Sequence, residues 1–182
     1  MKGQVFAEML NSPGSDFNGT PFDGICGMAY PALASSNESP PFFNMIKQGL
    51  VNEPVFTFYL KKDRQTGRAG GYMTIGGIDA ADYVGRMVWL PVIDKAYWLV
   101  SLNSVRLGFR QVSGDSEAIL DTGTSLIAGP KDAVNRINRI IGGVSVGEGM
   151  VAVSCSSIPN LPTMKIKLGG FATFSLRPID YV

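Results

Sequence analysis

The chain has 182 residues, 45% of them apolar and 17% charged, which is typical of a globular protein with a sizeable core. Because 16 basic side chains nearly balance 15 acidic ones, no cationic surplus exists to displace counterions from nucleic acid, and we expect no nucleic-acid partner. The absence of histidine excludes Ser-His-Asp and Cys-His catalysis and histidine-based metal sites, so we expect no metal and no cofactor and assign any acid–base chemistry to carboxylates.

Short strands follow one another along most of the chain. β-branched and aromatic residues between glycine-rich turns predict them, and the clearest is 164–168, where apolar and lysine side chains alternate before the turn at 169–170. No apolar run reaches the roughly 18 residues of a membrane-spanning helix, so we expect no membrane partner. The predicted strands cover residues 55–60, 72–75, 87–92, 98–107, 164–168 and 171–176.

Two short helices interrupt the strands. The first is predicted to begin at Pro41 and to end at Gly49, and the second has Pro130 at its first position and ends at Gly142. The apolar face of the second helix consists of Val134, Ile137, Ile140 and Ile141. Because strands dominate and helices are few, we expect a mainly-β fold.

One carboxylate stands directly after an apolar strand end. Asp121 follows Ile119 and Leu120, and these neighbours predict partial desolvation, which would raise its pKa. Gly123 lets the backbone turn tightly and bring an N–H group toward the carboxylate. Further donors are the hydroxyl groups of Thr122, Thr124 and Ser125.

An ordinary Asp-Thr-Gly turn is the competing interpretation of this segment, because Asp and Gly are common turn formers. The longer run Asp-Thr-Gly-Thr-Ser after an apolar pair is much rarer. At roughly one in twenty for each residue, its chance occurrence in such a chain is below about one in ten thousand. We therefore favour a functional carboxylate at Asp121.

On these motifs the chain resembles the pepsin and cathepsin D family of bilobal aspartic proteases, and most of all its cathepsin D-like members. The agreement runs nearly end to end, through residues 22–31, 56–60, 76–79, 96–98, 118–126, 155 and 161–162. The resemblance implies a pepsin-like bilobal acid protease fold, incomplete in this chain. Residues 1–83 are expected to hold the C-terminal part of the N-lobe and the interlobe sheet, and residues 84–182 most of the C-lobe.

The same resemblance implies a monomeric bilobal parent that cleaves polypeptide substrates. Asp121 would be the C-lobe member of a dyad that shares one proton, because two carboxylates so close cannot both ionise, and the pair would activate water. Thr122 would bond across to the opposite loop, while Gly123 and Thr124 would hold the substrate backbone. The implied pocket residues, for which core packing is an equal alternative, are Phe22, Ile25, Tyr97, Ile119 and Ile127.

The chain also departs from the family pattern. It holds no second Asp-Thr-Gly or Asp-Ser-Gly, and the flap hairpin is absent, so we expect an internal fragment that is inactive by itself. Cys155 resembles one half of a C-lobe disulfide whose partner lies beyond Val182. Cys26, where the family usually has leucine, is expected to be a small buried hydrophobe and not to bond to Cys155.

Two triplets match the acceptor pattern for N-glycosylation, at Asn18 and Asn37, although proline follows each of them. Together with the resemblance, they favour a glycoprotein of the secretory pathway, lysosomal or extracellular.

Two other functions fit the residues. A protease-like protein without catalysis would use the same cleft to hold peptides. Whether the N-lobe of the parent retains its aspartate would distinguish this function from proteolysis. A retroviral-type homodimer would pair one Asp-Thr-Gly from each chain. The N-lobe-like segment 22–31 and the chain length argue against the homodimer, so we favour an aspartic endopeptidase.

Overall fold

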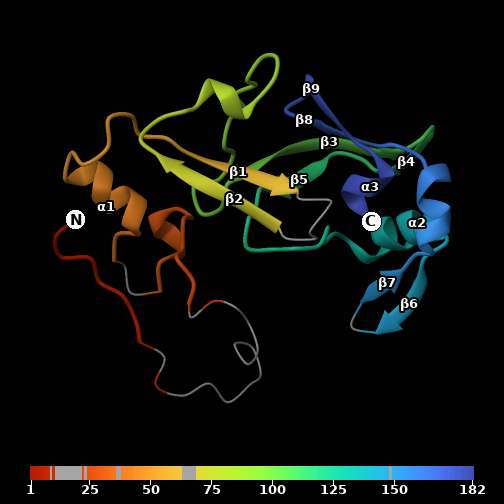
Figure 1. The fold of residues 1–182 in the computed structure, drawn as a ribbon, viewed down its shortest axis with the longest axis horizontal. Helices are drawn as coiled ribbons and strands as arrows, with labels where there is room; N and C mark the ends of the chain where they lie inside the picture. The colour runs from red at the N-terminus through yellow and green to blue at the C-terminus, as the bar shows by residue number, and fades with distance from the viewer. Residues whose placement is uncertain (9, 11–21, 23, 36–37, 63–68, 148) are drawn as a thin grey trace. The chain divides into compact units, whose positions relative to one another are not determined.

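The computed structural model describes residues 1–8, 10, 22, 24–35, 38–62, 69–147 and 149–182 (Figure 1). The chain forms two compact units, Met1–Met87 and Val88–Val182. The assignment of residues 1–83 and 84–182 to parts of two lobes stays a prediction.

The first unit packs one helix against a two-stranded antiparallel sheet. Its elements are η1 (Pro31–Leu33), α1 (Pro41–Lys47), β1 (Phe56–Lys62), β2 (Ala69–Ile75) and η2 (Ala80–Asp82). The buried ring of Phe42 in α1 meets the ring of Phe56 in β1 edge-on, with centroids 4.8 Å apart. In β2, a Cβ atom at Gly71 would lie 2.1 Å from the carbonyl oxygen of Tyr59, so only glycine allows the two strands to approach this closely.

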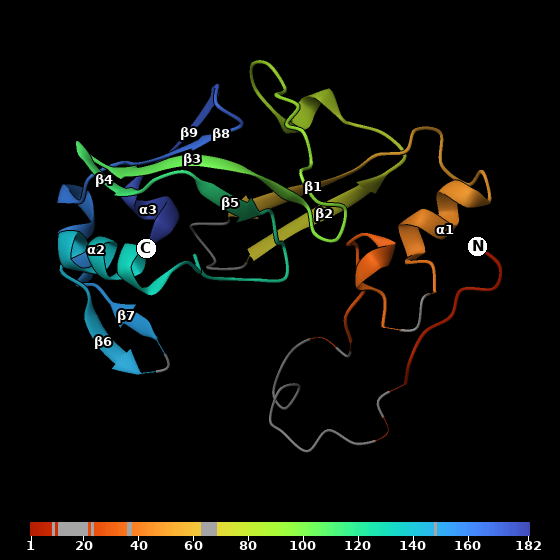
Figure 2. The same ribbon diagram turned by 180° about the vertical axis from the view of Figure 1, so that it is seen from behind.

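The second unit is built on one long strand. Its elements are β3 (Leu99–Leu107), β4 (Arg110–Ser113), β5 (Ser116–Ile119), α2 (Lys131–Ile141), β6 (Val144–Gly147), β7 (Met150–Ala152), η3 (Cys155–Asn160), β8 (Met164–Leu168), β9 (Ala172–Leu176) and α3 (Pro178–Tyr181). The main sheet has the order β4-β3-β8-β9, and β5 pairs with the first half of β3. Seen from behind, β3 runs the length of the sheet, while β6 and β7 form a separate hairpin (Figure 2).

The core of the second unit lies between this sheet and α2. It consists of the buried side chains of Leu107, Val112, Ile141 and Met164. Ile137 and Ile140 of α2 pack against this cluster, as the apolar face of the predicted helix requires. The Arg136 guanidinium links α2 to β4 by two hydrogen bonds, in which its Nε and Nη2 donate to the Val112 carbonyl over 2.9 and 2.8 Å.

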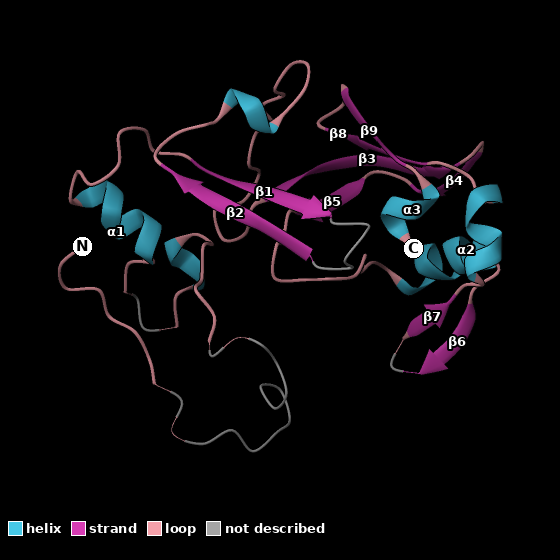
Figure 3. Ribbon diagram, viewed as in Figure 1, coloured by secondary structure: helices cyan, strands magenta, loops and turns pink. Residues whose placement is uncertain are grey.

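Strands outnumber helices in the second unit, and the described part of the first unit holds two paired strands, one α-helix and two short 3-10 turns (Figure 3), which confirms the mainly-β fold class. The second predicted helix is α2, and it ends at Gly142, which has a left-handed φ of 70°. Pro130 was expected to be its first residue and instead lies just before it. The strand expected at 87–92 is wrong. Trp89 in this segment is 69% exposed, and no strand of the described ranges pairs with it. Apolar and β-branched residues favour a strand only where a neighbouring strand pairs with them, and none does so here.

Candidate active site

The Asp121 loop begins where β5 ends. Pairing of β5 with β3 sets Ile119 opposite Leu99, and the N–H of Leu120 donates to the carbonyl of Trp98 over 3.1 Å. Asp121 is the next residue and is exposed to solvent. The register of these two strands therefore decides where the carboxylate leaves the sheet.

Two groups of the same loop bind the carboxylate. The N–H of Gly123 donates to Asp121 Oδ1 over 2.8 Å, and the hydroxyl of Thr124 donates to Oδ2 over 2.5 Å. A Cβ atom at Gly123 would lie 3.1 Å from Oδ1, so a side chain there would press on the carboxylate. The tight turn expected at Gly123 is confirmed.

These bonds lower the pKa of Asp121. The Thr124 hydroxyl contributes most and the Gly123 N–H second, because both stabilise the charged form, while desolvation acts weakly in the opposite direction. The expected rise in the pKa is wrong. Ile119 and Leu120 are themselves 47% and 56% exposed, so they do not shield the carboxylate from water.

The hydroxyl groups of Thr122 and Ser125 form no described hydrogen bond with Asp121. Thr122 and Ser125 are exposed, and within the described loop the donors to Asp121 are Gly123 and Thr124. A bond from Thr122 to an opposite loop, and contacts of Gly123 and Thr124 with substrate, stay predictions.

The five predicted pocket residues are all accessible to solvent. Their exposed fractions are 45% for Tyr97, 47% for Ile119, 54% for Ile127, 48% for Phe22 and 83% for Ile25. Core packing, the alternative for these side chains, is therefore not what the structure shows. The bond between Trp98 and Leu120 brings Tyr97 and Asp121 to neighbouring positions at the ends of two strands. Phe22 and Ile25 belong to the other unit, and a role for them beside Asp121 stays a prediction.

Both cysteines are free and exposed. That they do not bond to each other stays a prediction. The expected burial of Cys26 is wrong, because residues 24–29 form neither a helix nor a strand that would bury the thiol. The assignment of Cys155 as half of a disulfide stays a prediction. Asn18 and Asn37 lie outside the described residues.

The described acids and cysteines form no cluster of three or more that could hold a metal ion. Among the described ranges, every helix is too short or too polar to cross a membrane. What the loop offers chemically is one exposed carboxylate, kept ionised by two hydrogen bonds, which can accept a proton from a bound water.

A family model described as eukaryotic aspartyl protease matches residues 1–182. The chain belongs to this family. The resemblance derived from the motifs is thereby confirmed, and the mainly-β architecture is consistent with a pepsin-like fold of which this chain holds a part.

Individual family members agree along nearly the whole chain. Cathepsin D of Homo sapiens is 41% identical over 180 residues, which are 98% of this chain and 43% of that protein. Cathepsin D of Mus musculus is 39% identical over 181 residues (98% and 44%), and pepsin A of Suncus murinus is 40% identical over 169 residues (92% and 43%). The chain thus spans less than half the length of these curated relatives.

Two supports of the loop were not foreseen. The Trp98 carbonyl holds Leu120 in place, and Arg136 ties the helix after the loop to β4. The sequence predicted the strand that includes Trp98, so its pairing with the apolar residues just before Asp121 could have been inferred. Nothing in the sequence singles out Arg136 from Arg139, the other arginine of the helix.

Proposed function

We propose that this chain supplies the C-lobe aspartate, Asp121, of an aspartic endopeptidase. The observation that carries the proposal is the exposed Asp121 carboxylate at the end of a paired strand, bound by Gly123 and Thr124 of the family motif. Membership in the eukaryotic aspartyl protease family supports the reaction class.

In the proposed reaction, Asp121 is the ionised member of the dyad, because its hydrogen bonds lower its pKa. It accepts a proton from water as the water oxygen bonds to the scissile carbonyl carbon. A facing aspartic acid, contributed by the other lobe of the full-length protein, donates its proton to the carbonyl oxygen. Collapse of the tetrahedral intermediate then breaks the C–N bond, and the leaving nitrogen takes a proton from the dyad.

The proposed substrates are polypeptides with bulky apolar residues beside the cleaved bond. Exposed apolar side chains at Tyr97, Ile119 and Ile127, in the same unit as Asp121, support this preference. We also propose that residues 1–182 alone are inactive, since they hold one motif aspartate, and that the parent is a monomer of the secretory pathway.

The test is to replace Asp121 by Asn in the full-length protein and to measure cleavage of denatured globin at acidic pH. Turnover is expected to disappear while the melting temperature stays unchanged, because the side chain is exposed. Asp132→Asn, an exposed acid on α2, is the matched control and should retain activity. A near-normal rate for Asp121→Asn would refute the catalytic role.

Two further results separate the alternatives. Tight binding of a peptide inhibitor by a wild-type parent that shows no turnover would favour the non-catalytic peptide-binding protein. Inhibitor-sensitive cleavage by residues 1–182 alone would favour the homodimer.

A further inference from the structure

One aromatic side chain of the second unit is held out into water. Phe109 is 97% exposed at the two-residue loop between β3 and β4. Gly108 takes a φ of 59°, which suits the first position of such a loop, and its N–H donates to the Thr163 carbonyl over 3.0 Å. Arg106 Nη2 donates to the Phe109 carbonyl over 2.9 Å. The backbone of this hairpin tip is thus fixed from both sides, and its ring projects outward.

An isolated exposed ring is common on proteins, but this one stands among cations. Phe109, Arg110 and Arg139 line a surface cavity of about 410 Å³, and the rest of its lining is Leu107, Gly108, Ile140 and Pro162. Arg106 lies directly opposite Lys165 in the pairing of β3 with β8, an arrangement of like charges that costs stability. Within the described residues, none of these four cations forms an ion pair.

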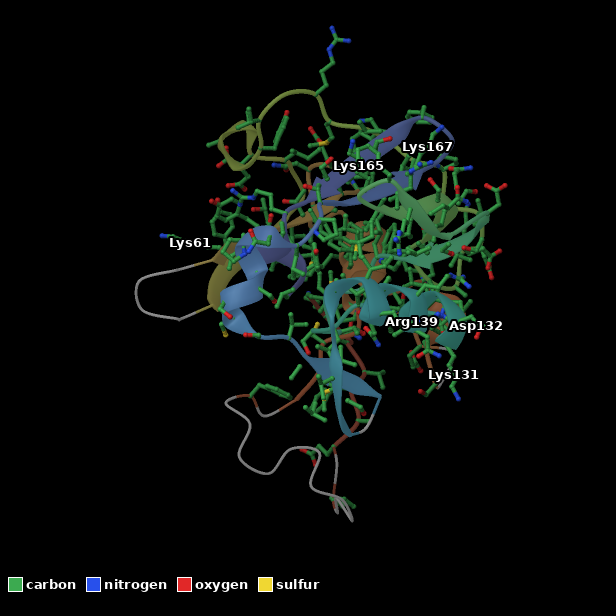
Figure 4. All side chains as sticks on the ribbon, turned by 90° about the vertical axis from the view of Figure 1, so that its right-hand side faces the viewer. Lys61, Lys131, Asp132, Arg139, Lys165 and Lys167 are labelled. Atoms are coloured by element: carbon green, nitrogen blue, oxygen red, sulfur yellow. The ribbon has the colours of Figure 1, made fainter. Side chains whose placement is uncertain are left out.

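Figure 4 labels cations that extend from β8 and from α2. Lys165 and Lys167 extend from β8, and Lys131 and Arg139 extend from α2, with Asp132 as the labelled acid among them. We call Phe109 with Arg106, Arg110, Arg139 and Lys165 the basic tip. Phe109, Arg110 and Arg139 line the same cavity, whereas Arg106 and Lys165 alternate with the buried Leu107 and Met164 and so lie on the face of the sheet turned away from α2. The positive charge of the basic tip has no matching acid on the strands that carry it, β3, β4 and β8.

The one acid in the strands of the main sheet, Glu117, and the Asp121 loop lie toward the start of β3. Glu117 pairs with Ser101 near the start of β3, and Asp121 follows Leu120, which bonds to Trp98. Leu107 lies eight positions after Leu99 along β3, a distance of about 26 Å at the usual rise per residue. A partner bound at the basic tip would therefore leave the Asp121 loop open.

We propose that the basic tip docks on an anionic phospholipid surface. Phe109 enters the headgroup region, as aromatic side chains do at membrane interfaces, and Arg110 and Arg139 bind a headgroup phosphate in the cavity between them. Arg106 and Lys165 add attraction to the negative surface. The proposal is independent of the proteolytic function. It differs from the expectation of no membrane partner, which rested on spanning segments only.

A lipid surface fits the tip better than a protein surface does. A stable protein interface buries about 800 Å² on each partner around several anchoring side chains. A two-residue loop presents one aromatic anchor on a protruding turn, which a fluid interface can surround. Binding an acidic protein is accordingly an outcome of the test.

The test is sedimentation of the full chain with vesicles of phosphatidylserine and phosphatidylcholine, and with vesicles of phosphatidylcholine alone. We expect binding to the anionic vesicles only, weakening as salt rises. Removal of each arginine should lower the affinity about fivefold, so Phe109→Ala with Arg110→Gln and Arg139→Gln should lower it at least about 25-fold. The matched control is Phe171→Ala with Lys95→Gln, an exposed ring and an exposed cation near the opposite end of β3. It should bind as the wild type does.

A second measurement does not depend on loss of binding. In a Phe109→Trp variant, the added emission should shift to shorter wavelength with anionic vesicles, whereas a Phe171→Trp variant should show no such shift. Equal binding to neutral vesicles, an equal loss in the control, or no emission shift at residue 109 would overturn the proposal. Binding of soluble polyglutamate or inorganic phosphate without binding of vesicles would overturn it in favour of an acidic protein or a free anion.

Discussion

Thr124 Oγ1 and Asp121 Oδ2 lie 2.5 Å apart within a single loop, and this hydrogen bond is the main cause of the lowered pKa of Asp121. The motif thus favours the charged form of its own carboxylate through bonds within the loop. A hydroxyl three residues after the aspartate therefore acts on the proton that the proposed reaction moves.

Replacing Thr124 by Ala in the full-length protein should shift the acidic limb of the profile of kcat/KM against pH to higher pH. The bond lowers the pKa of Asp121, so its loss raises that pKa, and the ionised form then disappears at a higher pH as the solution is acidified. Thr124→Ser keeps the hydroxyl and should retain the wild-type limb. A limb that stays in place or moves to lower pH in Thr124→Ala would contradict the assignment.

Shortening Leu107 to Ala should destabilise the second unit by about 2–5 kcal/mol, because it leaves a cavity in the core. Leu107 is 1% exposed and packs with Val112, Ile141 and Met164. Urea unfolding measures the change. Leu126→Ala, at a side chain that is 61% exposed, should change the free energy of unfolding by less than about 0.5 kcal/mol.

Replacing Arg136 by Met should cost about 1–3 kcal/mol in unfolding free energy, since the Val112 carbonyl of a buried residue loses both of its guanidinium donors. Arg139→Met on the same helix is the control. Among the described residues, Arg139 bonds only to a carbonyl of its own helix, over 3.4 Å, and its loss should be nearly neutral. Equal effects of the two substitutions would show that Arg136 does not tie α2 to β4.

Replacing Asp82 by Asn should lower the pKa of Tyr72. The hydrogen bond from the Tyr72 hydroxyl to Asp82 is the largest of the effects that raise the pKa of Tyr72 to about 12. Titration of phenolate absorbance should show one tyrosine that ionises near pH 12 in the wild type and earlier in Asp82→Asn. Glu53→Gln, an exposed acid of the same unit, should leave the titration curve unchanged.

Local patterns predicted most of the elements. Alternation marked the strand 164–168 to the residue, and glycine after an apolar helical face marked the end of α2 at Gly142. The failures share a cause. Residues 87–92 were expected to form a paired strand, and the side chain of Cys26 was expected to be buried. Strand pairing and burial both depend on which other part of the chain lies against the residue.

The amino-acid sequence by itself determined the family and the residue on which the proposed chemistry rests, because Asp121-Thr122-Gly123-Thr124 is a contiguous motif whose turn is local. Only the tertiary structure decided the exposure of Asp121 and the position of its loop. The Thr124 bond forms within the loop itself, whereas the hydrogen bond from Leu120 to Trp98 depends on the pairing of β5 with β3, which sets Ile119 opposite Leu99. The basic tip likewise exists only after folding, since Phe109, Arg139 and Lys165 come from separate elements that the packing of α2 and β8 against β3 brings together.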